Sequence, residues 1–254
     1  MKALMLAAGT GSRLSGGNDG HSPKALLKFG GQSLLARHLD HLSELGIQEL
    51  ALVVGYRSAE IIGEIDQLGA AGRVTIIQND EFRQGSSVSL WCARQVLVSG
   101  EDVLFMDADV LYHEEMLRRL LDAEAKNCFT FDAQVDDDDE PVKLCIRGGH
   151  PVEFRKKISG QFDRVGEWPG FLKLSAEMAA KLAERLDQYR DSVRTAEPYE
   201  EAIRDLLAKA VPGTFAIAEI SGVPWIEIDF DEDLRRAEDV ILPAIEKFKP
   251  TGGD

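Results

Sequence analysis

The chain has 254 residues, of which 44% are hydrophobic and 29% are charged. These proportions are typical of a globular protein, so a disordered or fibrous chain is excluded. The formal net charge of −15 repels nucleic acid and anionic membrane surfaces, and we expect neither as a partner. At roughly 100–200 residues per domain, the length allows one or two domains.

We expect neither a membrane anchor nor a disulfide framework. No apolar run approaches the roughly 18 residues of a membrane span, and the N-terminal apolar stretch is shorter than a signal-peptide core. Cys92, Cys128 and Cys145 are odd in number and widely spaced, which fits neither disulfides nor a C-x-x-C metal site. We therefore expect a cytoplasmic protein in a reducing compartment. The sequence leaves the oligomeric state open, a homodimer included.

Strands and helices alternate along the first half of the chain. Residues 2–7 are predicted to form a buried strand that runs into a glycine-rich segment, and Gly46 ends an amphipathic helix over 33–45. Further strands are expected at 49–54, 74–77, 102–106 and 127–132, and further helices at 59–65, 87–97 (capped by Ser86 or Ser87) and 114–125. This alternation predicts an α/β fold with a mostly parallel sheet and helices on both faces.

The second half of the chain is less regular. Segments 142–147 and 151–156 flank Gly148-Gly149, which predicts a hairpin with a two-residue turn. Short strands are expected at 171–174, 214–220 and 225–228, and helices at 176–189, 199–209 and 232–248. The acidic run 136–140 is predicted to be a solvated loop, and 251–254 a frayed tail.

A glycine loop follows the first strand, and Pro23-Lys24 lies about ten residues beyond it. Small residues let backbone N–H groups approach an anion closely, while Arg13 and Lys24 add fixed positive charge. In a chain of net charge −15, this is where we expect a triphosphate. A Walker A loop is excluded because no G-K-[ST] follows, and a dinucleotide fingerprint because Arg13-Leu14 replaces the third glycine. A G-x-G alone would leave an ordinary glycine-rich turn as the alternative.

The segment from Leu6 to Leu14, with Pro23-Lys24, resembles the signature of nucleotidyltransferases of the sugar-phosphate pyrophosphorylase type. Further segments extend the resemblance along most of the chain: Val53-Val54-Gly55-Tyr56, Asp107-Ala108-Asp109 and the late strand 225–229. The resemblance implies a Rossmann-like fold shared with glycosyltransferase A enzymes. The branch that looks most similar contains the phosphocholine and 2-aminoethylphosphonate cytidylyltransferases, whereas the glycine-rich stretch 15–22 departs from the sugar-phosphate branch.

The resemblance implies one nucleotidyltransferase domain over 1–254. Its nucleotide-binding half is expected at 1–132, its acceptor-binding half at 133–230, and a C-terminal helix and tail at 231–254. The implied reaction is Mg²⁺-dependent transfer of CMP from CTP to a small phosphonate or phosphate, such as 2-aminoethylphosphonate or phosphocholine, with release of pyrophosphate. As catalytic residues, Arg13 would hold the leaving phosphates and Lys24 would lie nearer the α-phosphate.

The nucleotide is expected on the glycine loop and on the polar segment 79–90, which corresponds to the family's base-binding loop. The residues expected to bind it are Leu6, Ala7, Ala8, Gly9, Gly11, Ser12, Asn79, Gln84, Gly85, Ser86, Ser87 and Asp107. For either serine alone, an ordinary helix cap is the alternative.

Asp109 and Asp229 are the candidate metal ligands. Each follows an apolar strand, and carboxylates at strand C-termini face the crevice in which α/β sheets bind ligands. Mg²⁺ prefers oxygen ligands and typically binds through one or two carboxylates plus substrate phosphates. Strand-end aspartates are also common helix caps, but Asp109 precedes its predicted helix by several residues.

The candidate acceptor site combines lysines, carboxylates and aromatic residues of the second half. Its predicted members are Lys143, Lys156, Glu167, Trp168 and Tyr199, with Glu197 and Glu200 beside them. Aromatic faces and carboxylates suit an ammonium group. A sugar would want amide side chains, and residues 145–223 contain only Gln161 and Gln188. Solvated helix faces are the alternative for the acids.

Two other functions remain as alternatives. One is a nucleotidyltransferase for a sugar 1-phosphate or inositol 1-phosphate. The other is an inactive regulatory homologue that binds nucleotide without turnover. The sequence argues against the inactive homologue because both loop glycines, both cations and both aspartates of the motif are present together.

Overall fold

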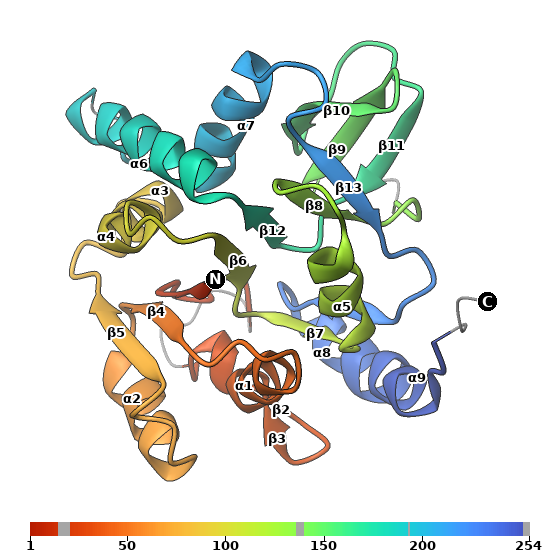
Figure 1. Ribbon diagram of the computed structural model, residues 1–254. Coiled ribbons are helices and arrows are strands. Elements are labelled where there is room, and N and C mark those ends of the chain that lie inside the picture. Colours follow the sequence, from red (N-terminus) through yellow and green to blue (C-terminus); the bar gives the residue numbers. More distant parts are fainter. Residues whose placement is uncertain (15–20, 136–139, 193, 251–254) are drawn as a thin grey trace.

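The computed structural model describes residues 1–14, 21–135, 140–192 and 194–250. It is a mixed α/β structure in which helices cover a large central sheet, as the alternating pattern predicts (Figure 1). Most of the acidic run 136–140 and the whole tail 251–254 lie outside the described residues. Within the described ranges, no helix combines the length and the apolar character that crossing a bilayer requires.

The central sheet has seven strands, and all but one of them run parallel. Their order across the sheet is β13 (Ala216–Glu219), β8 (Cys128–Phe131), β12 (Phe171–Leu174), β6 (Val103–Asp107), β1 (Lys2–Ala7), β4 (Leu50–Val54) and β5 (Val74–Gln78). Strand β12 is antiparallel to both of its neighbours, β6 and β8. Strands β1 and β6 are adjacent and parallel, so their carboxyl ends open side by side at one edge of the sheet.

Alternate residues of each central strand pack on opposite faces of the sheet. Leu4 and Phe105 belong to one buried cluster, whereas Met5 and Leu104 belong to the other. This two-residue period is what a strand that is covered on both sides requires. The first cluster includes residues of α3 (Ser86–Cys92), α4 (Arg94–Leu97), α6 (Ala176–Asp191) and α7 (Tyr199–Lys209). The second includes residues of α1 (Leu34–Glu44), α2 (Ser58–Gln67) and α5 (Glu115–Asp122).

A smaller antiparallel sheet lies beside β13 and α7 in Figure 1. Its strand order is β10 (His150–Arg155), β9 (Lys143–Arg147) and β11 (Arg164–Glu167). The predicted hairpin is confirmed: Gly148 and Gly149 join β9 to β10 with φ values of 58° and 79°. Two consecutive left-handed residues define the type I′ turn, which glycine adopts without strain.

The last part of the chain returns to the centre of the molecule. Strand β14 (Trp225–Glu227) pairs antiparallel with β7 (Val110–Tyr112), which directly follows β6. A helical segment then packs on this pair as α8 (Asp231–Arg236), a π-helical turn (Ala237–Ile241) and α9 (Leu242–Lys247). The short hairpin β2 (Lys28–Phe29) and β3 (Gln32–Ser33) precedes α1.

Several predicted boundaries are wrong. The single helix expected at 87–97 is interrupted at Ala93, and the one at 232–248 contains the π-helical turn. The helix expected at 114–125 ends at Asp122 because Ala123 takes an extended ψ of 128°.

Neither serine caps α3, since Gly85 holds the cap position and Ser86 Oγ accepts a hydrogen bond from Tyr199 N instead. Strands β7 and β11 were not predicted, because three or four residues give too little periodicity to detect.

Gly85, at the start of α3, packs closely against the segment that precedes α7. A Cβ atom at this position would overlap the carbonyl oxygen of Thr195 and press on Ala196. We expect Gly85→Ala to lower the free energy of unfolding by about 1–3 kcal/mol, because a backbone oxygen cannot move aside as a flexible side chain can. Urea denaturation measures the change.

Gly63→Ala is the matched control. Gly63 lies within α2, and a Cβ atom there would meet no atom within 4 Å. This variant should keep or raise the stability, by up to about 1 kcal/mol, because alanine favours the helix. Equal stability of the Gly85 variant and the wild type would show that the two segments are not held together at this point.

Candidate active site

A cavity of about 640 Å³ lies at the carboxyl ends of β1 and β6. The glycine loop after β1 forms one wall, and Asp107 to Asp109, at and just after the end of β6, form another. Residues of the second half complete it: three that lie just before or after strands of the small sheet, and others from α7 and from β14 and its end. This is the position at which open α/β sheets bind their ligands. The topology thus brings segments that are far apart in sequence to one site.

Most of the residues predicted from the sequence line this cavity. They are Leu6, Ala7, Ala8, Gly9, Gly11, Ser12, Arg13, Lys24, Gly85, Ser86, Asp107, Asp109, Lys156, Trp168, Tyr199 and Asp229. In the glycine loop, a Cβ atom at Gly9 would meet no atom within 4 Å, and Gly11 has a φ of 63°. The loop therefore presents bare backbone to the cavity, as the approach of a phosphate requires.

Lys24 lies between the two predicted metal ligands. Its Nζ is 2.9 Å from Asp109 Oδ2 and 2.6 Å from Asp229 Oδ1. Arg13 Nη1 contacts the other oxygen of Asp229 at 2.9 Å. The antiparallel pairing of β14 with β7 brings the two aspartates together, because it places the end of β14 beside the start of β7. Ile228 N donates a hydrogen bond to Asp109 O at 2.9 Å there. Two aspartates that are 120 residues apart thus share one ammonium group.

Glu227 is a third carboxylate of this cluster and is not among the residues predicted from the sequence. Oxygen atoms of Asp109, Glu227 and Asp229 all lie within 4.8 Å of one another. Burial, and then the negative charges of Asp109 and Asp229, raise the pKa of Glu227 well above its usual value. The signal was present in the sequence, because residues two apart on a strand share a face, and Glu227 is two residues before Asp229.

The electrostatics of the cluster suit a divalent cation. Burial alone would lower the pKa of Lys24, but the charges of Asp109 and Asp229 outweigh it and raise that pKa. Burial and the charge of Asp109 likewise raise the pKa of Asp107 well above its usual value. The raised pKa values of Asp107 and Glu227 show that the nearby cations do not fully balance the negative charge of these carboxylates. Carboxylate oxygens are also the ligands that Mg²⁺ prefers. Asp109, Asp229 and Glu227 are therefore the residues that could hold such an ion.

Arg13 and Lys156, two cations that line the cavity, contact the same carboxylate. Glu140 Oε2 is 3.1 Å from Arg13 Nη1 and 3.5 Å from Lys156 Nζ. Arg13 and Lys156 come from opposite halves of the chain, yet both reach the same carboxylate oxygen. They can therefore hold one anionic group between them, which is the arrangement that a phosphate or phosphonate needs.

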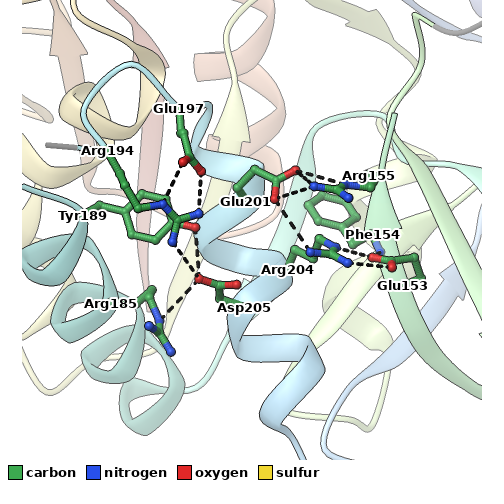
Figure 2. Close-up of polar contacts among 10 residues, drawn as sticks. All are labelled: Glu153, Phe154, Arg155, Arg185, Tyr189, Arg194, Glu197, Glu201, Arg204 and Asp205. Atoms are coloured by element: carbon green, nitrogen blue, oxygen red, sulfur yellow. Dashed lines mark hydrogen bonds and ion pairs between the residues drawn. The ribbon is translucent and has the colours of Figure 1, made fainter. Parts of the chain in front are cut away.

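The remaining wall is formed by aromatic residues and α7. The Tyr199 hydroxyl donates to Asp107 Oδ2, and the Trp168 and Tyr199 rings are 6.3 Å apart in an edge-to-face arrangement. Figure 2 shows how α7 is held: Glu201 pairs with Arg155 of β10, and Asp205 contacts arginines on the side of α6. These ion pairs fix α7 between two elements, so Tyr199 and Glu200 have defined positions at the cavity.

Five predicted residues do not line this cavity, and their side chains have other partners. Asn79 is buried and donates to Ser89 Oγ at 3.0 Å, and Gln84 is exposed and donates to Glu81. The Ser87 hydroxyl donates to Thr195 O at 3.3 Å, which fixes the segment before α7 rather than a base.

Of the residues predicted to bind the acceptor, two lie elsewhere. Lys143 Nζ donates to Lys156 O at 3.4 Å. Glu167 lies on an adjoining cavity of about 800 Å³, which shares Glu227 and Asp229 with the first.

Other lining residues were not predicted. Phe82 and Arg83 belong to the segment expected to hold the base, of which only other residues, mainly serines and amides, are predicted to bind nucleotide. Arg83 is a fourth cation of the wall, beside Arg13, Lys24 and Lys156. Gly170 lies against Asp107, and a Cβ atom there would contact that carboxylate at 2.8 Å. No sequence pattern marks this close approach.

The sequence matches the MobA-like NTP transferase domain family over residues 3–170. The chain therefore belongs to this family. The predicted class of enzyme, a nucleotidyltransferase, is confirmed by this membership, and the match covers the glycine loop and the end of β6.

Two curated relatives match nearly the whole chain. The bifunctional IPC transferase and DIPP synthase of Rubrobacter xylanophilus is 30% identical over 247 residues, which are 94% of this chain and 52% of the relative. The CMP-5'-(3-aminopropyl)phosphonate synthase of Streptomyces rubellomurinus is 28% identical over 245 residues, which are 94% of this chain and 38% of the relative. The chain thus spans about half or less of the length of these relatives.

A solved structure has the same fold. The CTP:phosphocholine cytidylyltransferase of Streptococcus pneumoniae superposes with a TM-score of 0.74 and covers 94% of this chain and 98% of its own. The sequence identity is 22%, so the similarity concerns the fold. It confirms the predicted Rossmann-like nucleotidyltransferase architecture.

Lys24→Met tests the charge balance of the carboxylate cluster. Without nucleotide, this variant should bind Mn²⁺ at least about tenfold more tightly than the wild type, because the ammonium that now neutralises Asp109 and Asp229 is gone. Asp229→Asn should weaken binding, since it removes one of the converging charges. Titration followed by water proton relaxation measures the affinity.

Lys181→Met serves as the control, because Lys181 pairs with Glu177 on the exposed side of α6. Glu44→Gln tests a separate group, His41, Glu44 and Glu114, whose ligand atoms also lie within 4.8 Å of one another. Neither variant should change Mn²⁺ binding at the cavity. An unchanged affinity in Lys24→Met would show that the ammonium and the ion do not compete for these carboxylates.

Proposed function

We propose that the protein is a cytidylyltransferase that transfers CMP from CTP to a small phosphonate or phosphate and releases pyrophosphate. The observation that carries this proposal is the convergence of the bare glycine loop, the Lys24–Asp109–Asp229 cluster and the Arg13–Lys156 pair on one cavity. The name of the S. rubellomurinus relative, a CMP-phosphonate synthase, supports the choice of cytidine and of a phosphonate acceptor.

In the proposed reaction, an oxygen of the acceptor's phosphonate or phosphate attacks the α-phosphorus of CTP. The new bond joins that oxygen to the α-phosphorus, and the bond to the β-phosphate oxygen breaks, so that pyrophosphate leaves with its electron pair. The attacking oxygen is already an anion, and no general base is needed. The main obstacle is the repulsion between two anions, on the order of 1–4 kcal/mol per charge pair near a surface.

The residues of the cavity would lower this obstacle by positioning and by charge. Backbone N–H groups of the glycine loop would hold the triphosphate, and Arg13 and Lys24 would neutralise it. Lys156, with Arg13, would hold the acceptor's oxyanion at the place where Glu140 now contacts both. Once the substrates have replaced the present carboxylate partners of these cations, the charges are in place before the α-phosphorus is attacked, so little reorganisation is needed at the moment of reaction.

We propose Mg²⁺ as the cofactor. Asp109 and Asp229, with Glu227 beside them, would hold it, since their oxygens converge within 4.8 Å. The ion would supply positive charge to the reacting phosphates. Lys24 contacts both aspartates and would then be free to turn towards the triphosphate.

We propose an acceptor that carries an amine or a quaternary ammonium, such as 2-aminoethylphosphonate or phosphocholine. Trp168, Tyr199 and Glu200 line the cavity, and aromatic faces and carboxylates attract an ammonium group. The acidic groups near the acceptor favour a primary amine over a trimethylammonium, which would want a fuller aromatic cage. Sugar and inositol 1-phosphates are the competing acceptors.

A pyrophosphate-release screen tests the function. It combines the four nucleoside triphosphates with amine-bearing phosphonates, phosphocholine, glucose 1-phosphate and inositol 1-phosphate, with and without Mg²⁺. We expect the highest specificity constant with CTP, Mg²⁺ and an amine-bearing acceptor. A higher value with a sugar or inositol phosphate would contradict the acceptor class alone, whereas no turnover with any pair would contradict the function.

Arg13→Ala and Lys24→Ala test the roles of the two cations. Each should lower turnover by about a hundredfold or more, because each removes a charge-assisted contact to the reacting phosphates. Lys28→Ala is the control, since Lys28 is an exposed residue of β2 that does not line the cavity. Steady-state kinetics with CTP measures the change, and near-normal turnover in either cavity variant would refute the phosphate-loop assignment.

A further inference from the structure

Glu200, in the wall of the cavity, has one carboxylate oxygen without a partner in the described part of the chain. It lies in the first turn of α7, and its Oε2 atom is shielded from solvent and has no hydrogen-bond partner among the described residues. Burial raises the pKa of Glu200 from its usual value. Buried carboxylate oxygens are almost always paired, so an unpaired one at a binding cavity points to a ligand that supplies the donor.

The neighbouring acids on the same segment are all paired, as Figure 2 shows. Glu197 is 2.6 Å from an Arg194 nitrogen, and Glu201 forms a two-oxygen contact with Arg155 at 2.9 and 3.0 Å. Asp205 accepts from the Tyr189 hydroxyl at 3.0 Å. These acids hold α7 in place, and Glu200 takes no part in that network. Its carboxylate is therefore available to the cavity and is held there by a rigid helix.

The charges that act on Glu200 divide the cavity into two kinds of site. Lys156 and Arg13 are the cations whose fields favour its ionised form, but no ion pair joins either of them to Glu200 in the described structure. Both instead contact Glu140. The cavity thus presents an anion site at Arg13 and Lys156 and, not in direct contact with those cations, the unpaired carboxylate oxygen of Glu200.

We propose that Glu200 binds the ammonium end of a zwitterionic acceptor while Arg13 and Lys156 hold its phosphonate or phosphate end. This inference rests on the proposed function and assigns the choice of acceptor to one residue. An ammonium supplies both the missing hydrogen bond and the missing positive charge, whereas a sugar hydroxyl would supply the hydrogen bond alone. Glu200 is thereby a specificity-determining residue of the acceptor site.

Glu200→Gln tests this assignment with two acceptors of nearly equal shape, 2-aminoethylphosphonate and propylphosphonate, in which a methyl group replaces the ammonium. With CTP as donor, the variant should lose about a hundredfold in kcat/KM for the amine, and its kcat/KM for propylphosphonate should stay within about threefold of the wild type. The KM for CTP should not change. The melting temperature of the variant should equal or exceed that of the wild type, because a buried unpaired charge has been removed.

Glu201→Gln is the matched control, since it makes the same change one residue further along and breaks the contact with Arg155. It should affect the two acceptors by the same factor. If Glu200→Gln also lowers both acceptors equally, Glu200 acts only through the structure or through Lys156, and the assignment is refuted. If the wild-type protein transfers CMP to neither phosphonate, the assignment of Glu200 to an aminophosphonate is refuted, whereas the proposed function itself is contradicted only if the pyrophosphate-release screen finds no acceptor.

Discussion

The pairing of β14 with β7 creates an electrostatic problem on which the rest of the site depends. It brings Asp229 and Glu227 against Asp109, in the cavity that Asp107 also lines, in a protein that is already strongly acidic. Carboxylates this close cannot all be ionised without a compensating cation. In the structure described here, the ammonium of Lys24 supplies that charge at 2.6 and 2.9 Å. The cluster is therefore built to hold positive charge, which Lys24 supplies here and which the proposed Mg²⁺ would supply in its place.

The same balance extends across the cavity. Arg13 joins the carboxylate cluster to the anion site, because its Nη1 contacts both Asp229 and Glu140. Incoming phosphates can replace these protein carboxylates without leaving the cations unpaired. Helix α7 carries a carboxylate that no cation of the described residues contacts directly, that of Glu200. The ion pairs of α7 with β10 and with arginines on the side of α6 keep this carboxylate in place (Figure 2). Two substrates of complementary charge pattern could thus bind without large movements of the backbone.

The sequence predicts the features that depend on local pattern and fails where distant segments meet. Asp109 and Asp229 could be identified because each follows an apolar strand, and Glu227 could have been added from its two-residue spacing to Asp229. Ser87 could not be assigned in the same way. Its hydroxyl points to Thr195, a residue 108 positions away whose approach is set by the packing of α3 on α6 and α7. Short strands such as β7 carry too little periodicity, although this one determines the site.

A structure of the protein with CTP and Mg²⁺, compared with the ligand-free form, tests the central claim that Lys24 is an exchangeable counter-charge. We expect Lys24 Nζ to leave Asp109 and Asp229 and to contact the triphosphate, which lies on the glycine loop. Lys24 Nζ still bridging both aspartates with the triphosphate and Mg²⁺ bound would contradict this claim.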